Sequence, residues 1–238
     1  MTYKAFTLAE VLITLGIIGI VAAMTLPSLT GKTKYKEFET RYKVASNLLH
    51  NAVNYFHSQE LMMTESTYCT ANSGADYCQG GQYRVFSEVL AEAFSGIHAL
   101  NKGGHGSYAA HKYYNFTGGA KFDGGLLNDG YMELKNGMSV IVETGGSSSN
   151  PIIFFDVNGT SVKPNRIGHD TFAFIIDKGD RICPLGSPSC KKRTEYIENT
   201  DNFLQSKFCN PSASTDQNNG LTCGYFASID KDYFKKIK

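Results

Sequence analysis

The chain has 238 residues, with a nearly neutral balance of 23 basic and 22 acidic side chains. Such a balance gives no broad electrostatic attraction to nucleic acid or to anionic lipid. The sequence contains no Gly-x-Ser-x-Gly, His-Glu-x-x-His or Walker motif, each of which would indicate a particular catalytic chemistry. We therefore expect a protein that is not an enzyme and that does not bind nucleic acid.

The first predicted element is an apolar run over residues 4–29, KAFTLAEVLITLGIIGIVAAMTLPSL. A helix needs about 20 mostly apolar residues to cross a bilayer, and this run is long enough. One carboxylate, Glu10, lies near its start. An acid inside a spanning helix is costly and by default marks a functional position. The run offers Glu10 no partner, so we expect a neighbouring subunit to supply one.

The letters KAFTLAEVL followed by a long apolar run resemble the N-termini of type IV prepilins and type II secretion pseudopilins. In that family a prepilin peptidase removes a short basic leader and methylates the new N-terminal residue. The resemblance implies a leader at residues 1–5, cleavage between Ala5 and Phe6, and N-methylation of Phe6. Glu10 matches the family's acidic residue, for which we expect a role in assembly, and Pro27 matches its helix-bending proline. The family prefers Gly where this chain has Ala5, so slower processing is expected.

The resemblance also implies the organisation of the whole chain. Residues 6–29 are expected to form a transmembrane and filament-core helix, and residues 30–238 an extracytoplasmic globular domain. The expected fold class is α+β, with the long N-terminal helix packed on an antiparallel β-sheet. The expected function is that of a structural subunit of a type II secretion pseudopilus. Its expected partners are pilin-like subunits, the prepilin peptidase, the inner-membrane assembly platform and membrane lipid.

The expected location is the bacterial inner membrane, in a single pass with the C-terminal domain outside the cytoplasm, and afterwards a pseudopilus or pilus. Alternatives remain open. The motif also fits a type IV pilus subunit for adhesion, motility or DNA uptake. Residues 11–22 could instead be the core of a secretory signal peptide, although an acid is unusual at the edge of such a core. A plain anchor for a non-assembling binding domain is also open, although plain anchors rarely carry a carboxylate.

After the apolar run, residues 33–63 are predicted to continue as a helix. Apolar residues recur there at alternating steps of three and four: Tyr35, Phe38, Tyr42, Ala45, Leu49, Ala52 and Phe56. This spacing makes one apolar stripe, and in pilin-like proteins the corresponding stripe packs on the sheet. His50 and His57 flank the stripe two turns apart, roughly 10 Å, which is too far for one metal ion.

A second helix is predicted over residues 83–96, ending at Gly96, and residues 101–125 are predicted to be Gly-rich loop. The predicted strands are residues 131–135, 138–143, 151–157 and 171–177. Asn136-Gly137 between the first two indicates a hairpin with a tight turn. The remainder of the chain is predicted to be mostly loop held by disulfides.

The 6 cysteines fall into close couples: Cys69 with Cys78, Cys183 with Cys190, and Cys209 with Cys223. An even number of cysteines in an exported chain indicates disulfides formed in an oxidising compartment. The sequence alone does not set the connectivity, and local pairing is the preferred expectation. No Cys-x-x-Cys or His-x-x-x-His spacing indicates a zinc site.

A second resemblance lies between the last two predicted strands. Residues 156–159 read DVNG, and PN and GHDTF follow at 164–165 and 168–172, a pattern similar to a segment of pilin-like proteins assigned to type II secretion. Asp156, Asn158 and Asp170 offer oxygen ligands of the kind Ca²⁺ takes, and major pseudopilins bind calcium in a loop. The alternative is that these side chains shape tight turns through their own backbone. We expect no cofactor, with a structural Ca²⁺ here as the alternative.

Overall fold

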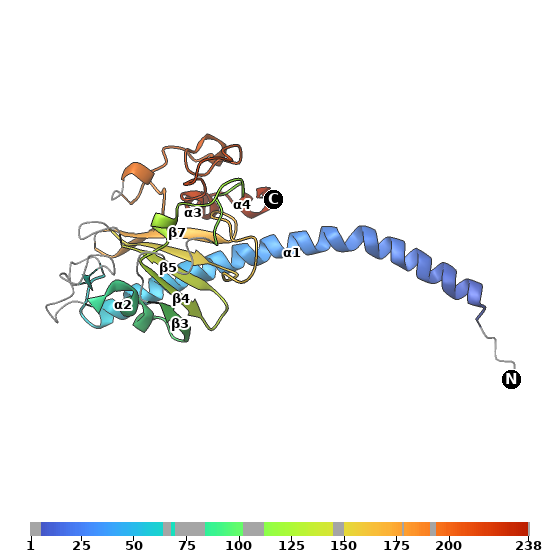
Figure 1. Ribbon diagram of the computed structural model, residues 1–238, viewed down its shortest axis with the longest axis horizontal. Helices are drawn as coiled ribbons and strands as arrows, with labels where there is room; N and C mark the ends of the chain where they lie inside the picture. The colour runs from blue at the N-terminus through green and yellow to red at the C-terminus, as the bar shows by residue number, and fades with distance from the viewer. Residues whose placement is uncertain are drawn as a thin grey trace. The chain divides into compact units, whose positions relative to one another are not determined.

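The structure is a computed structural model that describes residues 6–63, 68–69, 84–101, 112–144, 150–177, 179–190 and 194–237. Its longest element is α1, a helix spanning Leu8–Ser58 (Figure 1). By internal contacts the chain divides into residues 1–37 and residues 38–238. We call these the N-terminal unit and the globular unit.

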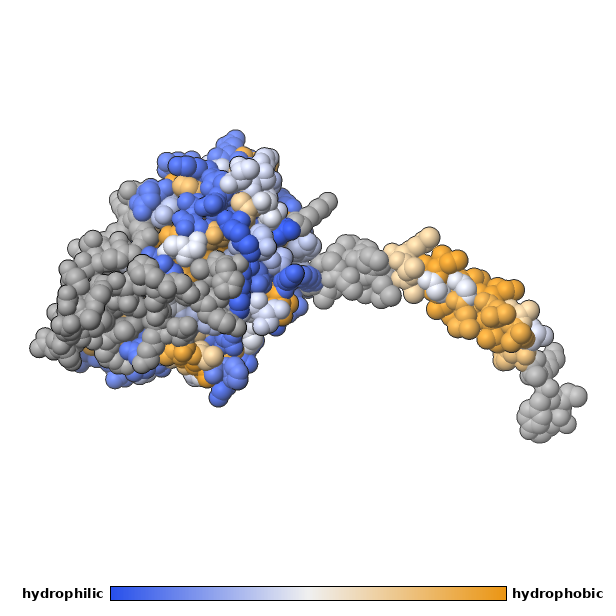
Figure 2. Space-filling model, viewed as in Figure 1, coloured by the Kyte–Doolittle hydropathy of each residue, from blue (hydrophilic) through white to orange (hydrophobic). Residues whose placement is uncertain are grey.

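The N-terminal unit consists of the first part of α1. Its stretch Leu8–Thr25 is long and apolar enough to cross a membrane, and none of it is buried. Figure 2 colours this stretch mostly orange, the colour of apolar residues. Gly16 and Gly19 have open space where a Cβ would be, so close packing inside this chain does not explain either glycine. The bend predicted at Pro27 falls among residues 26–33, whose side chains lie outside the described part of the chain.

The globular unit is built on a 6-stranded antiparallel sheet in the order β3-β4-β5-β6-β7-β8. Its strands are β3 (Ile97–Asn101), β4 (Gly130–Leu134), β5 (Ser139–Glu143), β6 (Ile152–Asp156), β7 (Thr171–Asp177) and β8 (Arg181–Pro184). A short parallel pair joins β1 (Tyr68–Cys69) to β2 (Arg84–Val85). The order in the sheet follows the order in the chain, so each strand pairs with its neighbour in sequence (Figure 1).

The central strands are apolar on both faces because both faces of the sheet are covered. Every residue of β5, β6 and β7 is buried. Successive side chains of a strand point to opposite faces, and β6 follows this rule. Phe155 packs on Phe174 of β7 with ring centroids 5.9 Å apart. Phe154, on the other face, packs on Phe122 from the segment between β3 and β4, with ring centroids 6.1 Å apart. The sheet therefore separates two layers of core.

The part of α1 within the globular unit covers one of these layers. Tyr42 lies 4.9 Å from Phe172 and 5.6 Å from Phe174, measured between ring centroids. Its hydroxyl donates a hydrogen bond of 2.8 Å to the Gly224 carbonyl. The buried residues of this helix segment are Phe38, Tyr42, Ala45, Leu49, Ala52, Val53 and Phe56. The predicted stripe and its packing on an antiparallel sheet are confirmed, and with them the α+β fold class.

Both predicted helices end earlier in the structure than the sequence predicts. α1 ends at Ser58 rather than at residue 63, because Glu60 adopts φ 58° and Leu61 N–H turns back to the Phe56 carbonyl. The second helix, α2, spans only Phe86–Ala93. The positions on either side of α2 pair as strands β2 and β3 instead.

The hairpin between β4 and β5 forms, but its turn is longer than predicted. Leu134 pairs with Met138, whose carbonyl accepts the Leu134 N–H at 2.8 Å, so Lys135, Asn136 and Gly137 form the loop. Gly137 takes φ 83°, a left-handed conformation that glycine adopts at low cost. A type I turn followed by such a residue is the common alternative to the shorter hairpin turn.

The C-terminal region contains more regular structure than predicted. Short 3-10 helices span Thr194–Tyr196 (η2) and Phe203–Gln205 (η3), whereas a third, η1 (Gly124–Leu126), lies earlier in the chain, before β4. Two short α-helices follow, α3 over Cys223–Ile229 and α4 over Tyr233–Lys236. Aromatic residues hold these pieces together, because Phe203 packs on Phe226 of α3 at 6.4 Å and on Tyr233 of α4 at 6.0 Å between ring centroids.

Candidate assembly site

Glu10 lies at the start of α1 and closes a capping box with Thr7. The backbone N–H and the hydroxyl of Thr7 both donate to Glu10 Oε2 at 2.8 Å. The Glu10 N–H donates in return to Thr7 Oγ1 at 3.2 Å. These bonds satisfy N–H groups that lack a partner inside the helix at its first turn. Sequence reasoning missed Thr7, although the Thr-x-x-Glu pattern was its signal.

The surface around Glu10 is apolar and exposed within the N-terminal unit. Phe6, which precedes Thr7, is 87% exposed, and Leu8 is 80% exposed. Glu10 is the only ionisable residue between Phe6 and Thr25. A contiguous apolar surface of this length needs lipid or protein to cover it. The helix therefore presents one carboxylate in an otherwise apolar surface.

Two of the predicted cysteine couples are disulfides in the globular unit. Cys183 and Cys190 are joined with a Cα–Cα distance of 6.0 Å, and Cys209 and Cys223 with one of 5.0 Å. Local pairing is confirmed for both. Cys69 lies in β1, whereas Cys78 lies outside the described residues, so their pairing stays a prediction.

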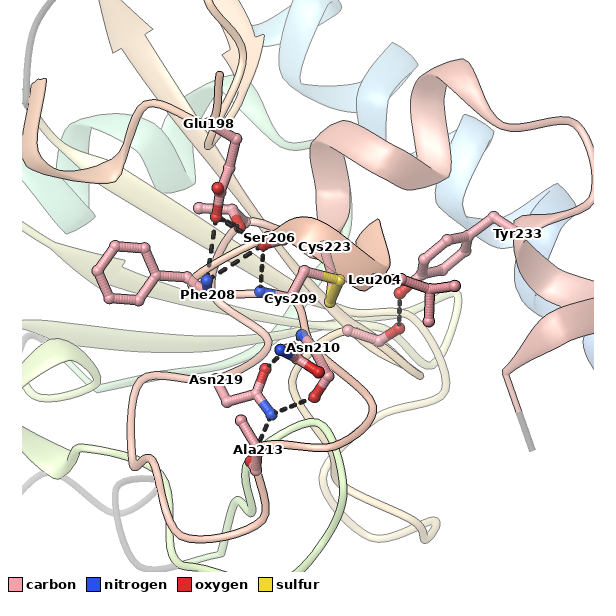
Figure 3. Close-up of a disulfide and its surroundings, with 12 residues drawn as sticks. Glu198, Leu204, Ser206, Phe208, Cys209, Asn210, Ala213, Asn219, Cys223 and Tyr233 are labelled. Atoms are coloured by element: carbon pink, nitrogen blue, oxygen red, sulfur yellow. Dashed lines mark hydrogen bonds between the residues drawn. A yellow bond between two sulfur atoms is a disulfide. The ribbon is translucent and has the colours of Figure 1, made fainter. Parts of the chain in front are cut away.

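A buried carboxylate, Glu198, holds both ends of the Cys209–Cys223 loop (Figure 3). Its Oε1 accepts hydrogen bonds from the hydroxyls of Ser206 and Thr222, both at 2.7 Å, and from Phe208 N–H at 3.0 Å. Glu198 is 5% exposed. From the sequence alone Glu198 would be expected at the surface, because Glu is rarely buried unless it has partners.

Inside the same loop, two asparagines bond to each other. Asn210 N–H donates to Asn219 Oδ1 at 2.8 Å, and Asn219 Nδ2 donates to the carbonyls of Asn210 and Ala213 at 2.7 Å (Figure 3). The loop is thus braced by a disulfide, a carboxylate and an amide. These bonds within the chain fix the conformation that the loop takes.

The residues considered for calcium are used to shape turns. Asp156 Oδ1 accepts the Gly159 N–H at 2.9 Å, and its Oδ2 accepts the Tyr113 hydroxyl at 2.7 Å. Asp170 accepts the N–H groups of Asn165 and Arg166, both at 2.8 Å. In the described part of the chain, no group of 3 or more His, Cys, Asp and Glu side chains is placed to hold a metal ion. The arrangement matches the turn-shaping interpretation.

The buried carboxyls of Asp156 and Asp170 do not readily carry two full negative charges at once. Burial, and secondly the charge of Asp170, raise the pKa of Asp156 to about 8. Burial raises the pKa of Asp170 to about 6, against hydrogen bonds from the backbone that lower it. Both carboxyls are fully buried. The pair of Asp156 and Asp170 therefore carries fewer than two full negative charges near neutral pH.

Residues 1–26 match the family model of the prokaryotic N-terminal methylation motif. This match confirms the prepilin-type resemblance and is consistent with a type IV pilin-like family. No curated protein and no solved structure matches the chain. Together with the exposed apolar helix, the motif indicates a membrane-anchored, pilin-like subunit of the cell envelope.

Proposed function

We propose that the chain is a structural subunit of a type II secretion pseudopilus rather than an enzyme. A prepilin peptidase cleaves it between Ala5 and Phe6, and Phe6 becomes the methylated N-terminus. The apolar helix anchors the subunit in the inner membrane, with the globular unit outside the cytoplasm, until the assembly platform adds it to a filament. The proposal rests on the methylation motif followed by an apolar helix with a single carboxylate.

One carboxylate oxygen of Glu10 accepts hydrogen bonds from its own helix, and the other accepts none from the described residues. Oε2 accepts both bonds from Thr7, whereas Oε1 accepts no hydrogen bond from any described residue. In the proposed filament, Oε1 receives the positive amine of a neighbouring subunit's Phe6. Such a pair escapes the counterion screening that weakens ion pairs in water. One carboxylate can thus cap its own helix and set the axial position of its neighbour.

Processing is tested by intact mass spectrometry of the protein extracted from membranes. The expected mass corresponds to a chain that begins at Phe6 and carries one methyl group. A chain that begins at Met24 would indicate a signal peptidase and would contradict the proposal. An Ala5→Gly variant is the matched control, because it restores the residue that the family prefers and should be processed at least as fast.

The type of filament is tested by deleting the gene and measuring two outputs in the same strain. The proposal predicts that an exported enzyme accumulates inside the envelope while surface pili stay normal in number. Normal secretion with a loss of pili, adhesion or DNA uptake would favour a type IV pilus subunit. Neither defect, together with a subunit that crosslinks to no other pilin-like protein, would favour a non-assembling anchored domain.

A further inference from the structure

A cavity of about 260 Å³ lies on the globular unit, and Pro211 of the Cys209–Cys223 loop forms part of its wall. Five separate pieces of the chain line it. Its walls include Phe116, Arg166, His169, Phe203, Pro211 and Lys236. The volume is below the roughly 300–1,000 Å³ of pockets that hold drug-sized ligands, so the cavity suits a smaller molecule.

Hydrogen bonds fix the pieces of chain that form the walls. The hydroxyl of Tyr233, which is fully buried in α4, donates to the Gly168 carbonyl at 2.6 Å. The Phe116 N–H donates to the Asn219 carbonyl at 2.8 Å. The aromatic walls are packed as well, because the His169 ring lies 4.9 Å from that of Phe116. The cavity is therefore already formed before any ligand binds.

The charged groups of the cavity are both cations. The Arg166 guanidinium makes no hydrogen bond and no ion pair with any described residue. The Lys236 ammonium pairs with Asp230 at 2.6 Å, and that pair is partly exposed. Among the described residues, no acceptor therefore binds the N–H groups of the Arg166 guanidinium, which lies beside apolar walls.

Gly118 explains how the guanidinium fits against the wall. A Cβ at Gly118 would lie 2.7 Å from Arg166 Nε and 2.9 Å from Cζ, which is closer than van der Waals contact allows. Gly118 also takes φ 77°, a conformation that favours glycine. The turn therefore leaves the space in which the planar guanidinium lies.

We propose that this cavity binds a small organic anion, a carboxylate or phosphate group carried on an apolar body. Arg166 would bind the anionic group through the paired N–H donors of its planar fork. Lys236 would add a second positive charge, and Phe116, Phe203 and Pro211 would cover the apolar body. The proposal is independent of the filament function, because the cavity residues belong to the globular unit alone.

The test is a calorimetric titration of the detergent-solubilised full chain with benzoate and, separately, with phenyl phosphate. Benzyl alcohol serves as the uncharged probe and measures partition into micelles. We expect saturable binding of one or both anions at roughly millimolar concentration, the range for such small ligands, and none of benzyl alcohol. The anion that binds more tightly identifies whether the cavity prefers a carboxylate or a phosphate group.

Variants link binding to the cavity. Arg166→Gln should weaken anion binding at least about tenfold, since a hydrogen bond to a charged group is lost. Lys231→Gln removes the same charge from an exposed position outside the cavity and should bind as the parent does. Gly118→Ala is a second variant, because it crowds the guanidinium without removing it. Absence of saturable anion binding, equal binding of benzyl alcohol, or unchanged binding in Arg166→Gln would overturn the proposal.

Discussion

The two parts of α1 share one secondary structure and differ in what covers them. In the N-terminal unit the stretch Leu8–Thr25 is apolar apart from Glu10, Thr14 and Thr25, and none of it is buried. In the globular unit the same helix is amphipathic, and residues such as Leu49 and Phe56 are buried against the chain's own sheet. An amphipathic helix completes its packing inside one molecule. An exposed apolar helix needs lipid or other protein to cover it, so we expect the first part of α1 to serve anchoring and assembly and the second part to serve folding.

This comparison predicts which substitutions change the stability of the globular unit. Packing residues of the second part of α1 should matter most, and changes in the N-terminal unit should matter least. The predictions that follow run from the largest expected change in the free energy of unfolding to the smallest.

The largest effect is expected at Leu49, which is fully buried. Leu49→Ala removes buried apolar atoms and leaves a cavity, at a cost of about 2–5 kcal/mol. Leu15→Ala is the matched control, because Leu15 is 60% exposed in the N-terminal unit. Chemical denaturation of the solubilised full chain measures both. Equal destabilisation by the two variants would contradict the view that only the second part of α1 stabilises the globular unit.

The Cys209–Cys223 disulfide is expected to contribute next. Its sequence separation is 14 residues, against 7 for Cys183–Cys190. In the chain-entropy model, loops of these sizes stabilise a fold by about 3 and about 2 kcal/mol respectively. Paired Cys→Ser replacements, measured by urea denaturation under oxidising conditions, should rank in that order. A larger loss at Cys183–Cys190 would show that native packing, rather than loop closure, sets the contribution.

An effect that appears only when the pH is changed is expected at Asp156. Its pKa is raised from 3.8 to about 8 by burial and by the charge of Asp170. Between these two values the folded state keeps a proton that the unfolded state releases, so stability falls as pH rises and levels off above about pH 8. Asp156→Asn removes this dependence. Its amide still accepts the Gly159 N–H and can donate to Tyr113.

The measurement for Asp156 is the melting temperature of parent and variant from about pH 4 to about pH 8, the window between the two pKa values. The parent should lose more stability across this window than Asp156→Asn does. Asp232→Asn is the control, because the pKa of this exposed carboxyl is lowered by Lys235 instead. Parallel pH profiles for the parent and Asp156→Asn would contradict the prediction.

The smallest effect on folding, and the largest on assembly, is expected at Glu10. Glu10→Ala and Glu10→Gln should leave the melting of the globular unit unchanged, since the Glu10 side chain bonds only to Thr7 among the described residues. Both should lose filament incorporation, because neither can attract a neighbour's amine. The measurement is recovery of sheared filaments alongside membrane levels of the subunit.

Thr7→Ala separates capping from docking. It removes the cap, worth about 1 kcal/mol of helix stability, and keeps the carboxylate. It should therefore assemble better than either Glu10 variant. If Thr7→Ala fails as completely as Glu10→Ala, the capping box rather than the charge is what assembly requires.

The sequence by itself determined the features that depend on local pattern. The apolar run and the stripe of α1 need only neighbouring residues to be recognised. The Thr-x-x-Glu pattern is equally local, although sequence reasoning missed it. The central strands β5, β6 and β7 were predictable for the same reason, since each is a short, strongly apolar run. The disulfides Cys183–Cys190 and Cys209–Cys223 close short loops, so local pairing was the right expectation.

Tertiary structure alone decided the features that depend on distant residues. The loop length of the β4–β5 hairpin follows from pairing Leu134 with Met138, a choice made by packing across the sheet. Burial of Glu198 required partners on both sides of a disulfide loop. The cavity at Arg166 gathers residues that lie far apart in the chain. No periodicity or motif brings such residues together, because their proximity exists only once the sheet and the C-terminal helices have packed.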